Sequence, residues 1–346
     1  MEDPVVARCL SRQQEFWRHA NSDGALIGLR EKWVFPLDSF SVGLPDGVLG
    51  PFSFDPADHA RVYLDFCREN GFVQGDLLLP ATPMTAFPWV EAMCGCEVHY
   101  SRDSKVVWAE PWLERLEDVG RIREYSQNQW FRGIVDYLTR LRDGIGPGFP
   151  VATTLMRGTG DILAAVRGTQ NFVYDMYDSP RQVMEAAEAC TEVFIESWKA
   201  QTEVIPEYGG GYFCGPMAVW APGKTIYFQE DVSAILSPDM YRRFFLPFDR
   251  ILAGVTPGLS LMHLHSTGLH VLDDVVSIEA LGCVQVCIDV LGPKPGDLLG
   301  EFRRVQDAGK CLMIYGDLNK AEVEILERAL RPEGLLIFVV RGIGQS

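Results

Sequence analysis

Two histidines on one predicted strand are the side chains of this sequence best suited to metal chemistry. Residues 259–265 read Leu-Ser-Leu-Met-His-Leu-His. Because successive side chains of a strand point to opposite faces, His263 and His265 share one face at the carboxyl end of the run. Neutral imidazoles are common ligands of divalent metals. The alternative interpretation is a pair of hydrogen-bonded core histidines, or of histidines that bind substrate without a metal.

The next predicted strand, 283–290, supplies a third candidate ligand. Its valine and isoleucine side chains alternate with Gln285, Cys287 and Asp289. The apolar set suits packing against helices, so the polar set should face the opposite side, with Asp289 near the rim. We predict that His263, His265 and Asp289 hold a divalent metal with one open position. We expect Gln285 to bind substrate and Cys287 to lie deeper, as a small apolar side chain.

Glu91 and Asp231 are the carboxylates that we expect to transfer protons. Glu91 belongs to the apolar, aromatic stretch 87–92, a setting that favours the protonated form of a carboxyl group. Asp231 follows the apolar run 225–228 and precedes a helix start, which suits a general acid, a general base or a metal ligand. A solvated loop carboxylate is the alternative for Asp231.

Asp161 and Arg167 are the predicted substrate-binding residues in the middle of the chain. The segment 157–161, Arg-Gly-Thr-Gly-Asp, begins a predicted helix as phosphate-binding turns do, but Leu163 replaces the third glycine of the dinucleotide fingerprint. The planar guanidinium of Arg167 can hold a carboxylate, and an ordinary ion pair is its alternative. The sequence contains neither a Gly-x-Ser-x-Gly elbow nor a phosphate-binding Gly-x-x-x-x-Gly-Lys motif, so serine hydrolysis and phosphoryl transfer are not favoured.

The elements that would position these side chains follow a βα rhythm. From residue 149 onward, short apolar runs alternate with helical patterns, which is typical of parallel βαβ units. Ser179-Pro180 and Ser237-Pro238 predict helix starts. About eight strands can be counted, which favours an α/β fold of the (β/α)8 TIM-barrel type, whose functional groups lie at the carboxyl ends of the strands. The predicted strands are 25–29, 76–80, 149–156, 259–265, 283–290, 311–315 and 335–340, with one more in the first third of the chain.

Composition and charge limit the partners of this chain. It has 346 residues, of which 47% are hydrophobic, and no linker or repeat divides it, so we expect one domain: an N-terminal extension or lid at 1–60 and a barrel at about 61–346. A net charge of −16 disfavours nucleic acid and anionic membranes. The chain starts without a signal-peptide pattern, and the apolar run 335–340 is too short to span a bilayer. Nine scattered cysteines indicate reduced thiols in a cytoplasmic protein.

Several motifs together resemble the uroporphyrinogen decarboxylase (URO-D) superfamily, especially its uncharacterised branches. Their order and spacing cover the chain from about residue 76 to the end. The fold that the resemblance implies is again a (β/α)8 barrel. The motifs are 91–98 (Glu-Ala-Met-Cys-Gly-Cys-Glu-Val), 161–168 (Asp-Ile-Leu-Ala-Ala-Val-Arg-Gly), 177–180 (Tyr-Asp-Ser-Pro), the segment 231–247, 263–265 (His-Leu-His) and 306–310 (Gln-Asp-Ala-Gly-Lys).

The resemblance is closer to the methyltransferases of the superfamily than to its decarboxylases. The N-terminal arginine element with which the decarboxylases hold porphyrinogen carboxylates has no counterpart, and residues 77–87 contain no aspartate for the pyrrole. The zinc motif of the corrinoid-linked methyltransferases is His-x-Cys with a distant second cysteine. His263 matches its histidine, whereas His265 and Arg341 stand where the two cysteines would be.

The resemblance therefore implies metal-assisted methyl transfer, with zinc as the expected metal and a corrinoid supplied by a partner protein. The substrate would be a small molecule, and the superfamily suggests a homodimer. Two other functions stay open: a decarboxylase or lyase that acts on a small carboxylate, and a ligand-binding barrel without catalysis, because a fold does not fix a function.

Overall fold

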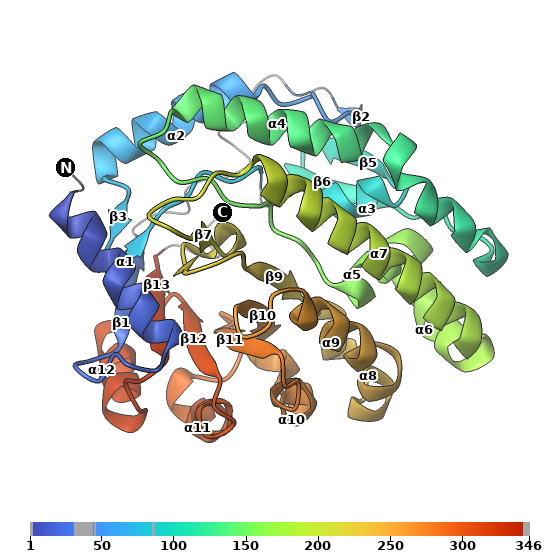
Figure 1. Cartoon of the computed structure of the whole chain (residues 1–346). Helices are drawn as coiled ribbons and strands as arrows, with labels where there is room; N and C mark the ends of the chain where they lie inside the picture. Colours follow the sequence, from blue (N-terminus) through green and yellow to red (C-terminus); the bar gives the residue numbers. More distant parts are fainter. Residues whose placement is uncertain (1–2, 31–43, 45, 85–86, 342–346) are drawn as a thin grey trace.

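Six parallel strands form the main sheet of the protein. The structure, a computed structural model, describes residues 3–30, 44, 46–84 and 87–341. Within these residues the strand order is β1-β13-β12-β11-β10-β9, and the sheet curves around an inner space in Figure 1. The chain is therefore an α/β protein. The strands are β1 (Leu26–Arg30), β9 (Ile226–Gln229), β10 (Ser260–His265), β11 (Leu281–Cys287), β12 (Cys311–Gly316) and β13 (Leu335–Val340).

The sheet has two faces with different contents, as the alternation of β11 predicted. Val284 and Val286 point outward, into the large apolar cluster shared with the surrounding helices. Cys283 belongs instead to an inner cluster with Leu261 and Tyr227. Gln285 and Cys287, which alternate with the two valines as Cys283 does, therefore point to the inner side of the sheet.

Helices connect consecutive strands of this sheet and cover its outer face (Figure 1). Standard capping starts two of them: the Ser237 hydroxyl accepts a hydrogen bond from the Met240 backbone N–H, and Asn319 and Glu322 form a capping box. The helix start predicted at Ser237-Pro238 is thereby confirmed. The connecting helices are α8 (Pro238–Phe244), α9 (Leu246–Val255), α10 (Leu272–Val276), α11 (Leu299–Asp307) and α12 (Lys320–Ala329).

The other half of the molecule is mainly helical, with short strand pieces. An antiparallel sheet has the order β2-β5-β6, and β3 pairs with β4, as β7 does with β8. The helices are α2 (Pro56–Asn70), α3 (Trp89–Met93), α4 (Gln129–Ile145), α5 (Thr159–Arg167), α6 (Thr169–Asp178) and α7 (Pro180–Val204). The strands are β2 (Gly47–Leu49), β3 (Val73–Gln74), β4 (Leu77–Leu78), β5 (Glu97–Ser101), β6 (Val106–Glu110), β7 (Tyr212–Phe213) and β8 (Trp220–Ala221).

The predicted strands in this half are shorter than expected. The run 149–156 contains only two isolated parallel bridges, Ala81 to Val151 and Ala152 to Phe213, and the run 76–80 contains the two-residue strand β4, paired antiparallel. The bridged residues come after edge strand β1 and before edge strand β9 along the chain. Among the described residues, a complete ring of eight strands is thus not confirmed.

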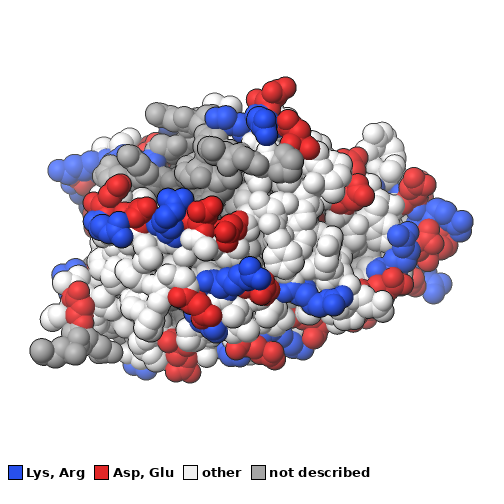
Figure 2. Space-filling view, turned by 90° about the horizontal axis from the view of Figure 1, so that it is seen from above, with Lys and Arg blue, Asp and Glu red and all other residues white. Residues whose placement is uncertain are grey.

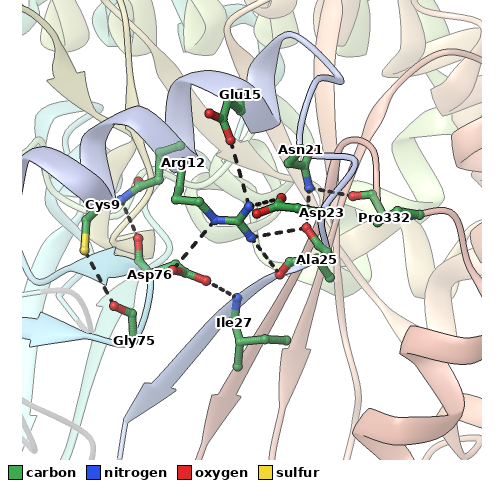
Figure 3. Close-up of polar contacts among 12 residues, drawn as sticks. Cys9, Arg12, Glu15, Asn21, Asp23, Ala25, Ile27, Gly75, Asp76 and Pro332 are labelled. Carbon is green, nitrogen blue, oxygen red and sulfur yellow. Dashed lines mark hydrogen bonds and ion pairs between the residues drawn. The ribbon is translucent and has the colours of Figure 1, made fainter.

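The N-terminal helix α1 (Pro4–Trp17) lies beside β1 in Figure 1, and its carboxyl-terminal half contacts the amino ends of strands of the sheet. Its Arg12 contacts Asp23 and donates to the backbone carbonyls of Gly24 and Ala25, at 3.2 Å each, just before β1 (Figure 3). The Phe16 carbonyl lies 3.2 Å from the thiol of Cys311, the first residue of β12. Of the predicted extension 1–60, residues 1–2, 31–43 and 45 lie outside the described residues.

The excess of acidic residues is interspersed with basic ones on the face seen in Figure 2, which looks down on the top of Figure 1, where α2 and α4 lie. Both helices carry ion pairs between successive turns, such as Asp65 with Arg68 at 2.6 Å and Asp136 with Arg140 at 2.9 Å. The described residues of this face therefore form no continuous basic stripe. No helix among the described ranges combines the length and apolar character that crossing a bilayer needs.

Candidate functional site

Three neighbouring strands bring polar side chains together at their carboxyl ends. His263 and His265 lie on β10, and their rings meet edge to face with centroids 4.9 Å apart. Asp231 begins the short 3-10 helix η4 (Asp231–Ile235), two residues after the end of β9. Asp289 lies two residues beyond the end of β11, in the following loop rather than in the strand as predicted. The parallel arrangement places all four at one end of the sheet.

The ligand atoms of Asp231, His263 and His265 lie within 4.8 Å of one another. His265 Nε2 is 3.6 Å from Asp231 Oδ1, an oxygen that is shielded from solvent and accepts no hydrogen bond from any described residue. A second group, which shares His265, combines it with Cys287 and Asp289 within the same distance. The alternation along one predicted strand placed the two histidines on the same face. The proximity of Asp231 to them depends on tertiary structure, which the sequence pattern does not show.

Hydrogen bonds fix which nitrogen of each imidazole is available. Nδ1 of His263 lies 2.6 Å from Gln285 Oε1, and Nδ1 of His265 lies 2.6 Å from Asp289 Oδ1. Both oxygens only accept, so each Nδ1 carries a proton, and the lone pair of each neutral ring lies on Nε2. The Gln285 orientation is consistent, because its amide nitrogen faces two thioether sulfurs, those of Met217 at 2.9 Å and Met313 at 3.1 Å.

The ionisation states of this site suit metal binding. Burial lowers the pKa of His263, which is 7% exposed, and the charge of Asp231 opposes that effect only partly. Burial raises the pKa of Asp289, but hydrogen bonds from Ser266 and His265 outweigh it, so the pKa of Asp289 is below its ordinary value. At neutral pH the structure therefore offers a neutral imidazole at His263 and an ionised carboxylate at Asp289.

Asp231 is held by contacts on both its side chain and its backbone. The Gln229 amide donates to Asp231 Oδ2 at 2.6 Å. The two oxygens of Asp161 accept from the backbone N–H groups of Asp231, at 3.0 Å, and of Val232, at 2.7 Å. Asp161, which we expected to bind substrate, thus contacts the backbone of the loop that carries Asp231.

The Arg-Gly-Thr-Gly-Asp segment that resembles a phosphate-binding turn packs against this loop. The Gly158 N–H donates to the Gln229 carbonyl at 2.6 Å, and the Gly160 N–H donates to both carboxylate oxygens of Glu230 at 3.0 Å. A Cβ at either glycine would collide with residue 229 or 230. The glycines therefore allow a close approach of two backbones, a use that the sequence motif did not reveal.

Glu91 lies outside the histidine cluster as a buried ion-pair partner. It is 2% exposed, on α3, and its carboxylate accepts from Arg157 Nη1 at 2.8 Å. The charge of Glu91 raises the pKa of Arg157, with smaller contributions of the same sign from Asp161 and Asp231. The charges of Glu91, Asp161 and Asp231 thus all act on the Arg157 guanidinium.

Arg167 is engaged at the opposite end of α5 from Asp161. Its Nε donates to Asp175 at 2.6 Å, and its Nη1 donates to the backbone carbonyls of Leu113, at 2.8 Å, and Glu114, at 2.7 Å. These contacts are those of the ordinary ion pair that was the alternative interpretation of this residue.

Arg30 is a candidate that the sequence did not single out. It is the last residue of β1, is 4% exposed, and its Cζ lies 5.0 Å from the centroid of the Phe338 ring. Its Nε and Nη2 are buried and have no hydrogen-bond partner among the residues that the structure describes. Burial lowers the pKa of Arg30 to about 10, which leaves it charged at neutral pH. A buried cation with open donors is a binding group for an anion. An isolated arginine at the end of one apolar run gives no recognisable motif.

Comparison with known proteins identifies a protein of similar fold but does not assign the chain to a family. No protein-family model matches the chain, and no curated protein matches it in sequence. Its structure is similar to that of a methyltransferase from Methanosarcina mazei, with a TM-score of 0.68 and 14% sequence identity over 96% of this chain and 93% of the other. At this identity the likeness shows a shared fold over nearly the whole length of both chains.

Proposed function

We propose that this chain is a methyltransferase-like enzyme that works with a divalent metal bound by His263, His265 and Asp231. The observation that carries the proposal is the convergence of two imidazoles, each with its Nδ1 already hydrogen-bonded, and the carboxylate of Asp231, one oxygen of which is shielded and has no hydrogen-bond partner among the described residues. Three protein ligands with an open position are the arrangement of a catalytic site. When bound, the metal would act as a Lewis acid on the substrate atom that gains or loses the methyl group.

In this proposal Asp289 and Gln285 orient the imidazoles instead of contacting the metal or substrate. Each accepts the Nδ1 proton of one histidine at 2.6 Å, the contact by which outer carboxylates and amides fix the ring and increase the basicity of Nε2. Gln285 is fully buried and lies beside His263, its register partner on the adjacent strand. These roles replace those of third ligand and substrate-binding residue that the strand pattern suggested.

The remaining side chains would bind and orient the substrate. The pairing of Glu91 with Arg157 favours a role in holding that guanidinium near Asp231 over the proton transfer expected from sequence. Arg30 takes the anion-binding role first expected of Arg167, because its donors are open while those of Arg167 are occupied.

The corrinoid partner and the complete barrel belong to the same proposal. The fold shared with a methyltransferase is the reason why methyl transfer ranks first. The corrinoid partner rests on the superfamily resemblance of the sequence motifs alone. Zinc is the expected metal, because it accepts two imidazoles and one carboxylate. The homodimer that the superfamily resemblance implies stays a prediction.

A decarboxylase or lyase is the second candidate, and Arg30 is the observation that favours it. An anion-binding guanidinium at the same end of the sheet as the histidines suits a carboxylate substrate. The histidine site could then stabilise negative charge that develops on the substrate.

Metal titration of the purified, chelator-treated protein tests the proposal. We expect one zinc or cobalt ion per chain, and His263→Ala should abolish the binding. Cys287→Ala, the matched control, should leave the affinity unchanged, because Cys287 belongs only to the second group of ligand atoms. If the wild-type protein binds no metal, the ligand-binding barrel becomes the better account. If Cys287→Ala removes the metal while His263→Ala does not, the ion occupies the second group.

A further inference from the structure

We infer that Asp161 is a positioning residue that places the carboxylate of Asp231 for metal binding. This inference rests on the proposed function, in which Asp231 is a ligand. Its basis is the pair of hydrogen bonds from the consecutive N–H groups of Asp231 and Val232 to the two oxygens of one side chain. These N–H groups belong to the first turn of η4, where no backbone carbonyl of the same helix can accept them.

The contact belongs to a continuous connection between two segments that are far apart in sequence. The segment 158–161 engages residues 229, 230, 231 and 232 in turn, through two glycine N–H groups and then the Asp161 carboxylate. The backbone on each side of Asp231 is therefore fixed to the start of α5. Because a carboxylate on a short side chain moves with its backbone, this connection determines where the Asp231 oxygen lies relative to the two histidines.

The geometry of the contact requires two accepting oxygens at residue 161. An aspartate has two accepting oxygens, and here each meets one N–H donor. In Asp161→Asn, which has nearly the same shape, the amide nitrogen would face one of these donors and one hydrogen bond would be lost. The neighbouring turn of η4 could then shift, although Asp231 itself is unchanged.

The test compares cobalt(II) affinity and cobalt spectra of the wild type with those of Asp161→Asn and Asp161→Ser. We expect Asp161→Asn to weaken binding by about 10- to 100-fold, the range found when groups that orient metal ligands are replaced. Asp161→Ser keeps one short acceptor, which serves if the asparagine variant folds poorly, and should also weaken binding. The matched control is Asp175→Asn, which breaks an ion pair at the other end of α5 and should leave the affinity unchanged.

Amide hydrogen exchange gives a second readout that needs no metal. In the chelator-treated protein, Asp161→Asn should accelerate exchange at Asp231 and Val232 and leave Gly158 and Gly160 protected. Wild-type affinity, spectrum and exchange in both Asp161 variants would overturn the inference while the metal proposal stands. A wild-type protein that binds no cobalt would overturn both, whatever the exchange rates.

Discussion

At the scale of single residues, the site depends on which nitrogen atoms of the two histidines already have hydrogen-bond partners. The oxygens of Gln285 and Asp289 occupy Nδ1 of the two histidines, and the Nε2 atoms are left for a ligand. The sequence predicted that the histidines share a face but could not show these partners, because Asp289 lies in a loop whose course depends on tertiary contacts with Ser266. The side-chain roles therefore became clear only with the structure.

The two aspartates at the site should respond differently to amide substitution. Asp231→Asn should lower zinc affinity by at least about 100-fold, because it removes a charged ligand. Asp289→Asn should lower the affinity by about 10-fold, because its amide oxygen can still accept the His265 proton while the charge is lost. Titration calorimetry at constant pH measures both. Equal losses would contradict the assignment of Asp231 as ligand and Asp289 as orienting residue.

Arg30 should contribute to binding at the expense of stability. A buried guanidinium with two unsatisfied nitrogens is unfavourable for the folded state, so Arg30→Met should raise the free energy of unfolding by about 1–3 kcal/mol. Urea unfolding of the ligand-free protein measures this change. The control Arg167→Met should be destabilising, because that guanidinium is fully engaged. A loss of stability in Arg30→Met would mean that this side chain is structural.

At the scale of elements, regular strands could be predicted and close backbone contacts could not. The runs at β12 and β13 are mainly apolar, and β10 carries two histidines among apolar residues. All three are of ordinary strand length and paired along their whole length, and there the predicted bounds agree with the structure within one residue. The run 149–156 is also mostly apolar, but it pairs only through two isolated parallel bridges, so hydrophobicity predicted a longer strand than this pairing gives. The role of Gly158 and Gly160 depends on a segment about 70 residues away in sequence.

Gly160→Ala should separate the start of α5 from the Asp231 loop. The added Cβ would collide with the Glu230 carboxylate and the Val232 side chain, so we expect a destabilisation of about 1–3 kcal/mol and weaker metal binding. The matched control is Gly254→Ala in α9, where a Cβ has open space and alanine should stabilise the helix by up to about 1 kcal/mol. Thermal unfolding and zinc titration of both variants check the pair. A neutral Gly160→Ala would contradict the close packing.

At the scale of the whole molecule, the structural comparison supports the fold more directly than it supports the function. The likeness to a methyltransferase covers 96% of the chain, so the scaffold is shared, but the side chains at the site must support any activity. Some of the acidic residues behind the net charge of −16 lie in the interior of the protein. Glu230 and Asp249 are both fully or nearly fully buried, and burial raises the pKa of each. Acidic groups are thus part of the core as well as of the surface.

This buried acidic pair should make the protein less stable as the pH rises. Burial raises the pKa of Asp249 to about 7, above the ordinary value of 3.8, and the Tyr241 hydroxyl donates to its carboxyl group at 2.6 Å. Below about pH 4 both the folded and the unfolded chain hold this proton, so the full contribution of the group is present there. Between about pH 4 and pH 7 only the folded state keeps it, so the contribution declines by up to about 1.4 kcal/mol per pH unit.

Asp249→Asn isolates that contribution, because the amide imitates the protonated carboxyl group at every pH. The free energy of unfolding, measured in urea from pH 5 to pH 8, should fall more steeply in the wild type than in the variant. Groups such as Asp289, whose lowered pKa gives the opposite slope, are common to both proteins and cancel in the difference. Parallel curves would show that Asp249 is ionised in the folded state and that the core contains a paired charge rather than a proton.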